Sequence, residues 1–266
     1  MKIGVFDSGF GGLTVLRELL RHIPAADYAY LGDTARLPYG AKSRATVARY
    51  AASSARFLVE EEEAELLVIA CNTASALALE AIREAVAVPV LGVVETGANA
   101  ADVNSTTRDV LVIATAATVE SHAYAAACAA RKMRVIEKAC PLLVPLVEEG
   151  WTEHPVTNEV VRIYMDELME QAAAANLKAD TLVLACTHYP LLRETIERAV
   201  PQAVRVIDSA EVTAQQVAVQ LGSVVQSAGQ PKVQFFATDS VAKFKDLGTR
   251  FLGQAIPAVR LVDLGG

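Results

Sequence analysis

The chain has 266 residues, of which 53% are hydrophobic and 21% are charged, and its formal net charge is −7. This composition excludes a disordered chain and is typical of a compact α/β protein. The negative charge argues against nucleic acid or an anionic membrane surface as a partner, because both attract basic surfaces. No apolar stretch approaches the roughly 20 residues of a membrane helix, and the N-terminal run is too short for a signal peptide. We therefore expect a cytoplasmic protein whose four cysteines are free thiols.

Short β-branched runs alternate with amphipathic segments, a pattern that predicts parallel sheets covered by helices. In the first part of the chain we expect strands at Lys2–Asp7, Asp27–Gly32, Leu66–Cys71 and Pro89–Val94. The segments between these strands predict helices at about Leu13–His22, Ser43–Glu62 and Ala74–Val86. Turn residues are frequent in the loops Ser8–Gly12 and Asp33–Gly40.

The same alternation then begins again. We expect strands at Asp109–Thr115, Arg134–Ala139 and Thr181–Cys186, with helices at about Val119–Arg131, Leu143–Gly150 and Val156–Asn176. After Arg205–Asp208, the pattern predicts helices at Glu211–Leu221 and Val241–Leu252 and strands at Val233–Ala237 and Val259–Val262. The similarity of the two halves favours a duplicated α/β unit.

Two cysteines have matching contexts in the two halves. Cys71 ends the run Leu-Leu-Val-Ile-Ala and is followed by Asn72, whereas Cys186 ends Thr-Leu-Val-Leu-Ala and is followed by Thr187. A strand that turns into a helix at a cysteine places the thiol beside free backbone N–H groups and the positive end of the helix dipole. We therefore expect lowered thiol pKa values. Two such thiols on opposite sides of a cleft suit the removal and return of a proton at both faces of one carbon.

Other interpretations of the cysteines remain open at this point. Each could be a small buried core residue, which is the interpretation favoured for Cys128 and Cys140. Cys71, Cys186 and His188 could bind zinc, although structural zinc sites use four ligands in closely spaced pairs and the chain has no Cys-x-x-Cys motif. An acyl-transfer pair of Cys186 and His188 would leave Cys71 without a role.

Functional loops gather at the carboxyl ends of parallel strands, and Asp7 and Thr115 end predicted strands as the two cysteines do. Asp7 begins Asp-Ser-Gly-Phe-Gly-Gly, which differs from the dinucleotide pattern G-x-G-x-x-G. Its carboxylate is either a partner for a catalytic thiol or a solvated loop group. His188 has the strongest context of the four histidines, because it follows Cys186 by two residues. Glu148 is ambiguous, and a surface position is favoured for it.

In these motifs the chain resembles the glutamate racemase family, part of the aspartate/glutamate racemase superfamily. The similarity runs nearly end to end and is carried by the segments Asp7–Leu13, Gly32–Gly40, Cys71–Ser75, Pro145–Glu148, Cys186–Leu191 and Asp208–Ser209. The form Cys-Thr-His-Tyr-Pro around the second cysteine is closer to glutamate racemases than to aspartate racemases.

The resemblance implies a cofactor-independent, two-base racemase that interconverts L- and D-glutamate and supplies D-glutamate for peptidoglycan, and hence for cell-wall biogenesis and cell shape. Cys71 would take the α-proton from D-glutamate and Cys186 would take it from L-glutamate. Asp7 would assist Cys71, and His188 would assist Cys186, with Glu148 nearby. The residues that match substrate-binding positions of the family are Asp7, Ser8, Pro38, Tyr39, Gly40, Cys71, Asn72, Thr73, Thr115, Thr118, Cys186, Thr187 and His188.

The resemblance also implies two similar parallel-sheet α/β lobes with the active site in the cleft between them, no metal, and a homodimer. Residues 1–95 and 209–266 would form lobe one, and residues 96–208 would form lobe two. Three rival functions remain. A two-lobed amino-acid-binding protein would need no opposed thiols, a decarboxylase would need only one, and a superfamily relative would act on aspartate or a hydantoin.

Overall fold

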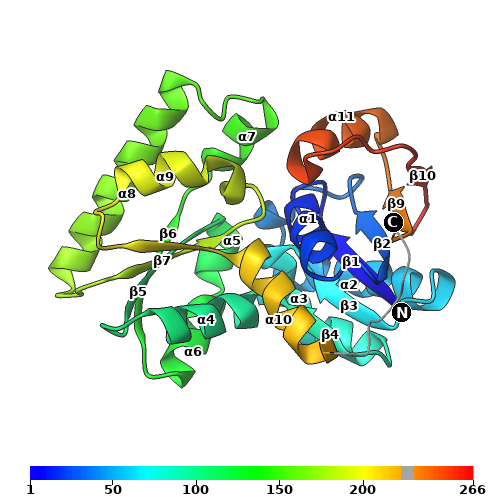
Figure 1. Ribbon diagram of the computed structural model, residues 1–266, viewed down its shortest axis with the longest axis horizontal. Helices are drawn as coiled ribbons and strands as arrows, with labels where there is room; N and C mark the ends of the chain where they lie inside the picture. The colour runs from blue at the N-terminus through cyan, green and yellow to red at the C-terminus, as the bar shows by residue number, and fades with distance from the viewer. Residues whose placement is uncertain (223–230, 266) are drawn as a thin grey trace.

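The structure is a computed structural model that describes residues 1–222 and 231–265. In this part of the chain, two separate β-sheets are each covered by helices, and they lie side by side (Figure 1). Every strand pairing in both sheets is parallel. The expected fold of two parallel-sheet α/β lobes is therefore confirmed.

The first sheet is built from both ends of the chain. Its strands are β1 (Lys2–Asp7), β2 (Asp27–Gly32), β3 (Leu66–Ile69), β4 (Val90–Gly92), β9 (Val233–Ala237) and β10 (Arg260–Leu261), in the order β10-β9-β2-β1-β3-β4. Its neighbouring helices are α1 (Leu13–His22), α2 (Arg44–Arg56), α3 (Asn72–Ala85) and α11 (Val241–Leu252), with a short 3-10 helix at Tyr39–Ala41 and a short π-helix at Phe57–Glu61. Helices cover both faces of this sheet, so alternate side chains of β1 are buried in different hydrophobic cores. Ile3 and Val5 lie in one core, and Phe6 lies in the other.

The second sheet comes from the middle of the chain. Its strands are β5 (Asp109–Ala114), β6 (Arg134–Ala139), β7 (Thr181–Ala185) and β8 (Arg205–Asp208), in the order β6-β5-β7-β8. The helices around it are α4 (Val93–Asn104), α5 (Ala116–Glu120), α6 (Ala123–Ala130), α7 (Leu143–Glu148), α8 (Pro155–Ala174) and α9 (Arg193–Ala199), with a 3-10 turn at Tyr189–Leu192. Helix α10 (Ser209–Leu221) leads from β8 back towards the first sheet and contacts both α4 and α1 (Figure 1).

The predicted elements agree with the structure in most places. Several bounds differ by one or two residues, the helix expected at 43–62 is α2 followed by a short π-helix, and three further differences concern α4, α5 with α6, and α9. The strand expected at 89–94 is only Val90–Gly92, because the chain enters the unpredicted helix α4 at Val93. The helix expected at 119–131 is divided into α5 and α6, because His122 adopts a left-handed conformation (φ 53°). Helix α9 was not expected at all. None of the helices in residues 1–222 and 231–265 combines the length and apolarity that crossing a membrane would require.

Candidate active site

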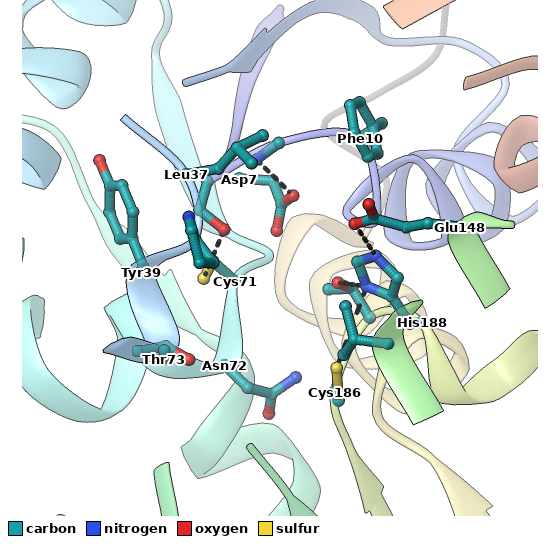
Figure 2. A pocket seen from close by; sticks show the side chains of 16 residues that line it. Asp7, Phe10, Leu37, Tyr39, Cys71, Asn72, Thr73, Glu148, Cys186 and His188 are labelled. Atoms are coloured by element: carbon teal, nitrogen blue, oxygen red, sulfur yellow. Dashed lines mark hydrogen bonds and ion pairs between the residues drawn. The ribbon is translucent and has the colours of Figure 1, made fainter. Parts of the chain in front are cut away.

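A cavity of about 80 Å³ lies between the carboxyl ends of the two sheets (Figure 2). One buried water needs roughly 10–15 Å³ on the same measure, so this cavity has room for a group of several heavy atoms. Residues that follow β1, β2 and β3 form one side, and residues that follow β7, together with α7, form the other. The walls are Asp7, Ser8, Gly9, Phe10, Leu37, Pro38, Tyr39, Gly40, Cys71, Asn72, Thr73, Val144, Glu148, Cys186, Thr187 and His188.

Two thiols face this cavity from different sheets, and both are buried (Figure 2). Cys71 lies between β3 and α3, where its Sγ caps the helix by accepting from the backbone N–H of Ala74 at 3.4 Å. The same thiol donates to Oγ of Ser8 at 3.4 Å. Cys186 follows β7, and its Sγ lies 4.0 Å from Nδ1 of His188. The predicted convergence of the two strand-end cysteines on one site is thus observed.

The pKa values of the two thiols differ from the expectation. Burial raises the pKa of Cys71 to about 11, and the negative charge of Asp7 adds to this effect. Burial also raises the pKa of Cys186, to which the charges of Cys71 and Asp7 contribute. Backbone N–H donors act in the opposite direction but are outweighed in both cases. The prediction of lowered pKa values is wrong, because desolvation of the buried thiols outweighs the stabilisation of the thiolates by backbone N–H groups.

Asp7 is a buried carboxylate with one free oxygen. Its Oδ2 accepts from the backbone N–H of Gly9 at 2.9 Å, whereas its Oδ1 has no hydrogen-bond partner among the described residues. Burial raises the pKa of Asp7 above its usual value, although the N–H groups of Gly9 and Gly12 and the charge of His188 oppose the shift. A carboxylate of raised pKa beside a thiol is suited to exchanging a proton with it.

His188 lies between Cys186 and a carboxylate. Its Nε2 is 3.1 Å from Oε1 of Glu148, and its Nδ1 faces Cys186 and lies 3.4 Å from Oγ1 of Thr187 (Figure 2). The ring of Phe251 packs edge-on against the imidazole, with the ring centroids 4.9 Å apart. The expectation of a surface position for Glu148 is wrong, since this side chain lines the cavity and orients His188.

Hydroxyl and amide groups form the rest of the polar wall. Oγ1 of Thr73 lies 3.0 Å from Oγ1 of Thr115 and 3.3 Å from Oγ1 of Thr118. Thr115 and Thr118 do not line the cavity themselves but contact Thr73, which does. The Nδ2 atom of the buried Asn72 has no hydrogen-bond partner in the described part of the chain. A free donor in a cavity wall is available to a ligand that accepts hydrogen bonds.

The loop with Pro38, Tyr39 and Gly40 is held by one fully buried carboxylate. Asp33 accepts from the Tyr39 hydroxyl at 2.5 Å and from Thr238 Oγ1 at 2.9 Å, and it pairs with Nε of Arg36 at 2.8 Å. Thr238 follows β9, so the C-terminal part of the chain helps to place a loop that begins near residue 33. This carboxylate fixes one wall of the cavity.

All the predicted site residues except Thr115 and Thr118 line the cavity directly. Four further residues line the cavity that the sequence does not single out, namely Gly9, Phe10, Leu37 and Val144. The first three lie within the motifs Asp7–Leu13 and Gly32–Gly40. Val144 precedes Glu148 by four residues on α7, a spacing that places two side chains on one helix face.

The other two cysteines lie outside the site, and the described residues contain no cluster suited to a metal ion. Cys128 and Cys140 are buried in hydrophobic cores, as expected, and neither lines the cavity. Over residues 1–222 and 231–265, no set of three or more His, Cys, Asp or Glu side chains is arranged to hold a metal ion.

Two buried thiols, each with an acid–base partner, on either side of a cavity between two α/β lobes define an isomerase-type proton-transfer site. The model of the Asp/Glu/Hydantoin racemase family matches residues 3–217, and the chain belongs to this family. The curated glutamate racemase of Koribacter versatilis is 51% identical over 99% of this chain and 98% of its own length. That of Geobacter metallireducens is 45% identical over 98% of this chain and 96% of its own.

Solved structures show the same fold over almost the whole chain. Glutamate racemase from Francisella tularensis in complex with D-glutamate has a TM-score of 0.88 at 35% identity, covering 99% of this chain and 97% of that one. Glutamate racemase from Thermus thermophilus in complex with beta-chloro-D-alanine also has a TM-score of 0.88, at 42% identity and the same coverage.

Proposed function

We propose that this protein is a glutamate racemase that interconverts L- and D-glutamate without a cofactor and supplies D-glutamate for peptidoglycan synthesis. The observation that carries the proposal is the pair of buried cysteines at matching strand ends, which line one cavity from two lobes. The identity to curated glutamate racemases over nearly the full chain supports glutamate as the substrate.

The two cysteines act as the two bases. With D-glutamate bound, the Cys71 thiolate removes the α-proton, and the electron pair of the C–H bond stays on the α-carbon. The Cys186 thiol then donates its proton to the opposite face of that carbon and becomes the thiolate. L-glutamate reacts in the reverse direction, so the two sulfurs exchange protonation states at every turnover.

Asp7 and His188 move protons to and from the thiols. Asp7 accepts the proton of Cys71, and its raised pKa and free Oδ1 atom support this role. His188 serves Cys186, and Glu148 keeps the imidazole in position for this transfer. These partners compensate for burial, which by itself keeps both sulfurs protonated.

The substrate is held by neutral donors and backbone groups. We assign binding roles to Ser8, Pro38, Tyr39, Gly40, Asn72, Thr73 and Thr187, with Thr115 and Thr118 acting through Thr73. The N-terminus of α3 begins at the cavity wall, and its positive dipole favours a carboxylate and the negative charge that develops during proton removal.

We also assign residues 1–95 and 209–266 to lobe one and residues 96–208 to lobe two, with the active site in the cleft between them. The strand content of the two sheets supports this division. The family resemblance further predicts a cytoplasmic homodimer, which light scattering on the purified protein and fractionation of cells would test.

The decisive experiment is incubation of the purified protein with D-glutamate in deuterated buffer without added cofactor or metal. We expect optical rotation to be lost while deuterium enters the α-carbon of the L-product. D-aspartate serves as the control substrate and distinguishes an aspartate racemase. Bound glutamate without exchange would instead favour an amino-acid-binding protein.

A further inference from the structure

Asn72 presents an unpaired amide nitrogen to the cavity. The residue follows Cys71 directly, begins α3, and is only 3% exposed (Figure 2). Its Oδ1 accepts a hydrogen bond of 2.7 Å from the hydroxyl of Tyr124, whereas its Nδ2 has no partner in residues 1–222 and 231–265. Burying a donor without a partner is costly, so this nitrogen is a site for an acceptor on the ligand.

The hydroxyl of Tyr124 decides which end of the amide faces the cavity. A tyrosine hydroxyl has one hydrogen to donate, and its two nearby acceptors are Oδ1 of Asn72 at 2.7 Å and the carbonyl of Val93 at 3.4 Å. The Val93 carbonyl already accepts from Oγ1 of Thr96 at 3.0 Å. The tyrosine proton therefore goes to Asn72, which turns the NH₂ group away from Tyr124.

The structure makes room for this contact between two different lobes. Tyr124 is fully buried on α6, beside the second sheet, and Asn72 begins α3, beside the first. A Cβ atom at residue 97 would lie 3.0 Å from the Tyr124 hydroxyl oxygen, so Gly97 leaves the space that the hydroxyl occupies. The Asn72 amide is consequently held in one orientation by a residue of the opposite lobe.

We propose that Tyr124 is a positioning residue that fixes the Asn72 amide with its N–H groups towards a substrate carboxylate. Because the hydroxyl and the amide belong to different lobes, this donor is oriented when the lobes are closed. The inference rests on the proposed function in one respect, namely that the ligand is an amino acid whose carboxylate accepts from Asn72.

Tyr124→Phe tests the proposal, because it removes only the hydroxyl. We expect KM for D-glutamate to rise about fivefold to tenfold, the effect of losing one oriented hydrogen bond, while kcat stays within about twofold. In an Asn72→Ala background, the same substitution should change neither parameter further. An unchanged KM, or an equal effect in both backgrounds, would overturn the proposal.

Tyr28→Phe is the matched control. Its hydroxyl is equally buried but lies 2.8 Å from the carbonyl oxygen of Ile23 and 3.1 Å from that of Leu19, away from the cavity. We expect this variant to lose thermal stability and to keep the wild-type KM. A rise in KM that matches that of Tyr124→Phe would assign the effect to general destabilisation.

A second measurement needs no substrate. The side-chain amide resonances of Asn72 in the ligand-free protein can be assigned by their loss in Asn72→Ala. We expect them to shift in Tyr124→Phe and to remain in place in Tyr28→Phe, and an unchanged signal in Tyr124→Phe would reject the positioning role. If the wild-type protein neither binds nor racemises glutamate, the proposed function fails, and these resonances still decide the role of Tyr124.

Discussion

Cys71 and Cys186 are buried thiols with raised pKa values, although a racemase needs one of them as a thiolate. Burial of the cavity wall limits the access of water to the reacting carbon, but it also disfavours a charged sulfur. Asp7 and His188 resolve this conflict in our proposal, because each can take a proton within the cavity. The pH dependence of the reaction therefore belongs to pairs of groups and not to single residues.

Asp7→Asn should change the pH profile of racemisation. In the wild-type protein Cys71 can transfer its proton to Asp7, so kcat/KM should be nearly flat from neutral pH upwards. In the variant the thiolate must form by loss of a proton to solvent. Burial still keeps the pKa of the Cys71 thiol above its usual value, although the contribution of the Asp7 charge is gone, so the thiolate fraction is small at neutral pH and grows tenfold per pH unit below that pKa. We expect a loss of roughly a hundredfold at pH 8 that diminishes as the pH rises.

The measurement is kcat/KM for D-glutamate between pH 6 and about 9.5, which lies below the raised pKa of the thiol. The control is Asp27→Asn. Asp27 lies outside the cavity, and its carboxylate accepts a hydrogen bond from the backbone N–H of Lys232. If kcat/KM of Asp7→Asn did not change with pH, Asp7 would take no part in proton transfer and would only position other groups.

Cys71→Ala and Cys186→Ala should each abolish racemisation, because removal of either sulfur leaves one face of the carbon without an acid–base group. We expect losses of at least about a thousandfold, with glutamate binding retained. Chiral chromatography of the products and calorimetry of binding would measure the two properties. Cys140→Ala, which truncates a buried thiol outside the cavity, should cost stability and leave turnover intact. Near-normal turnover in either site variant would contradict a two-base mechanism.

At the scale of secondary structure, the positions of the strands in the chain were the most predictable feature of the molecule. Apolar runs ending at Asp7, Cys71 and Cys186 indicated parallel strands, and parallel strands bring their carboxyl ends to one edge of a sheet. The bounds of β1, α1 and β2 agree with the prediction residue for residue, because a Gly-rich turn and polar residues separate them clearly.

Helix α4 shows what local sequence could not predict. It begins with Val93 and Val94, which favour strands, and it contains Gly97 inside the helix. Tertiary packing overrides these preferences, since Val93, Val94, Ala98 and Ala101 are buried and α4 packs against α10. Desolvation of the thiols is a similar case, because burial depends on residues that are distant in the sequence.

Asp33→Asn should loosen the loop that carries Pro38, Tyr39 and Gly40. The amide cannot satisfy Arg36, Tyr39 and Thr238 together, because one carboxylate oxygen becomes a donor. We expect KM for glutamate to rise about tenfold and the free energy of unfolding to fall by about 2 kcal/mol. Steady-state kinetics and urea denaturation measure the two effects.

Glu80→Gln is a suitable control for this variant, since Glu80 pairs with Arg83 at 2.8 Å on an exposed helix face. Such a pair contributes little, so both quantities should stay at their wild-type values. If Asp33→Asn loses stability but keeps KM, the buried carboxylate supports the fold without placing the loop.

At the scale of the whole molecule, the two lobes meet closely around the cavity. Oγ1 of Thr14 in the first lobe lies 3.1 Å from the backbone carbonyl oxygen of Thr187 in the second, and 2.9 Å from that of Gly11 in the glycine turn. A Cβ atom at residue 11 would lie 2.6 Å from Nδ1 of His188 and closer still to Oγ1 of Thr187. Gly11 therefore lets the two lobes come together beside the cavity.

Gly11→Ala should keep the lobes apart. The imidazole of His188 cannot move aside freely, because Glu148 and Phe251 hold it, and Thr187 is a short branched side chain with little freedom. The added methyl group must displace the second lobe or His188 itself, and either change misplaces Cys186. Since a displacement of about 1 Å can cost a hundredfold in rate, we expect kcat/KM to fall by roughly that factor.

Gly4→Ala is the control that distinguishes an effect on the approach of the two lobes from a general loss of stability. Its Cβ atom would lie 2.5 Å from Cδ2 of Leu67 inside the first lobe, so it should lower the melting temperature without changing KM. For Gly11→Ala we expect an unchanged melting temperature and the hundredfold fall in kcat/KM. We also expect a larger radius of gyration by small-angle X-ray scattering in the presence of D-glutamate. Equal radii for the variant and the wild type, with normal kinetics, would mean that the glycine turn yields to the methyl group and that closure does not depend on Gly11.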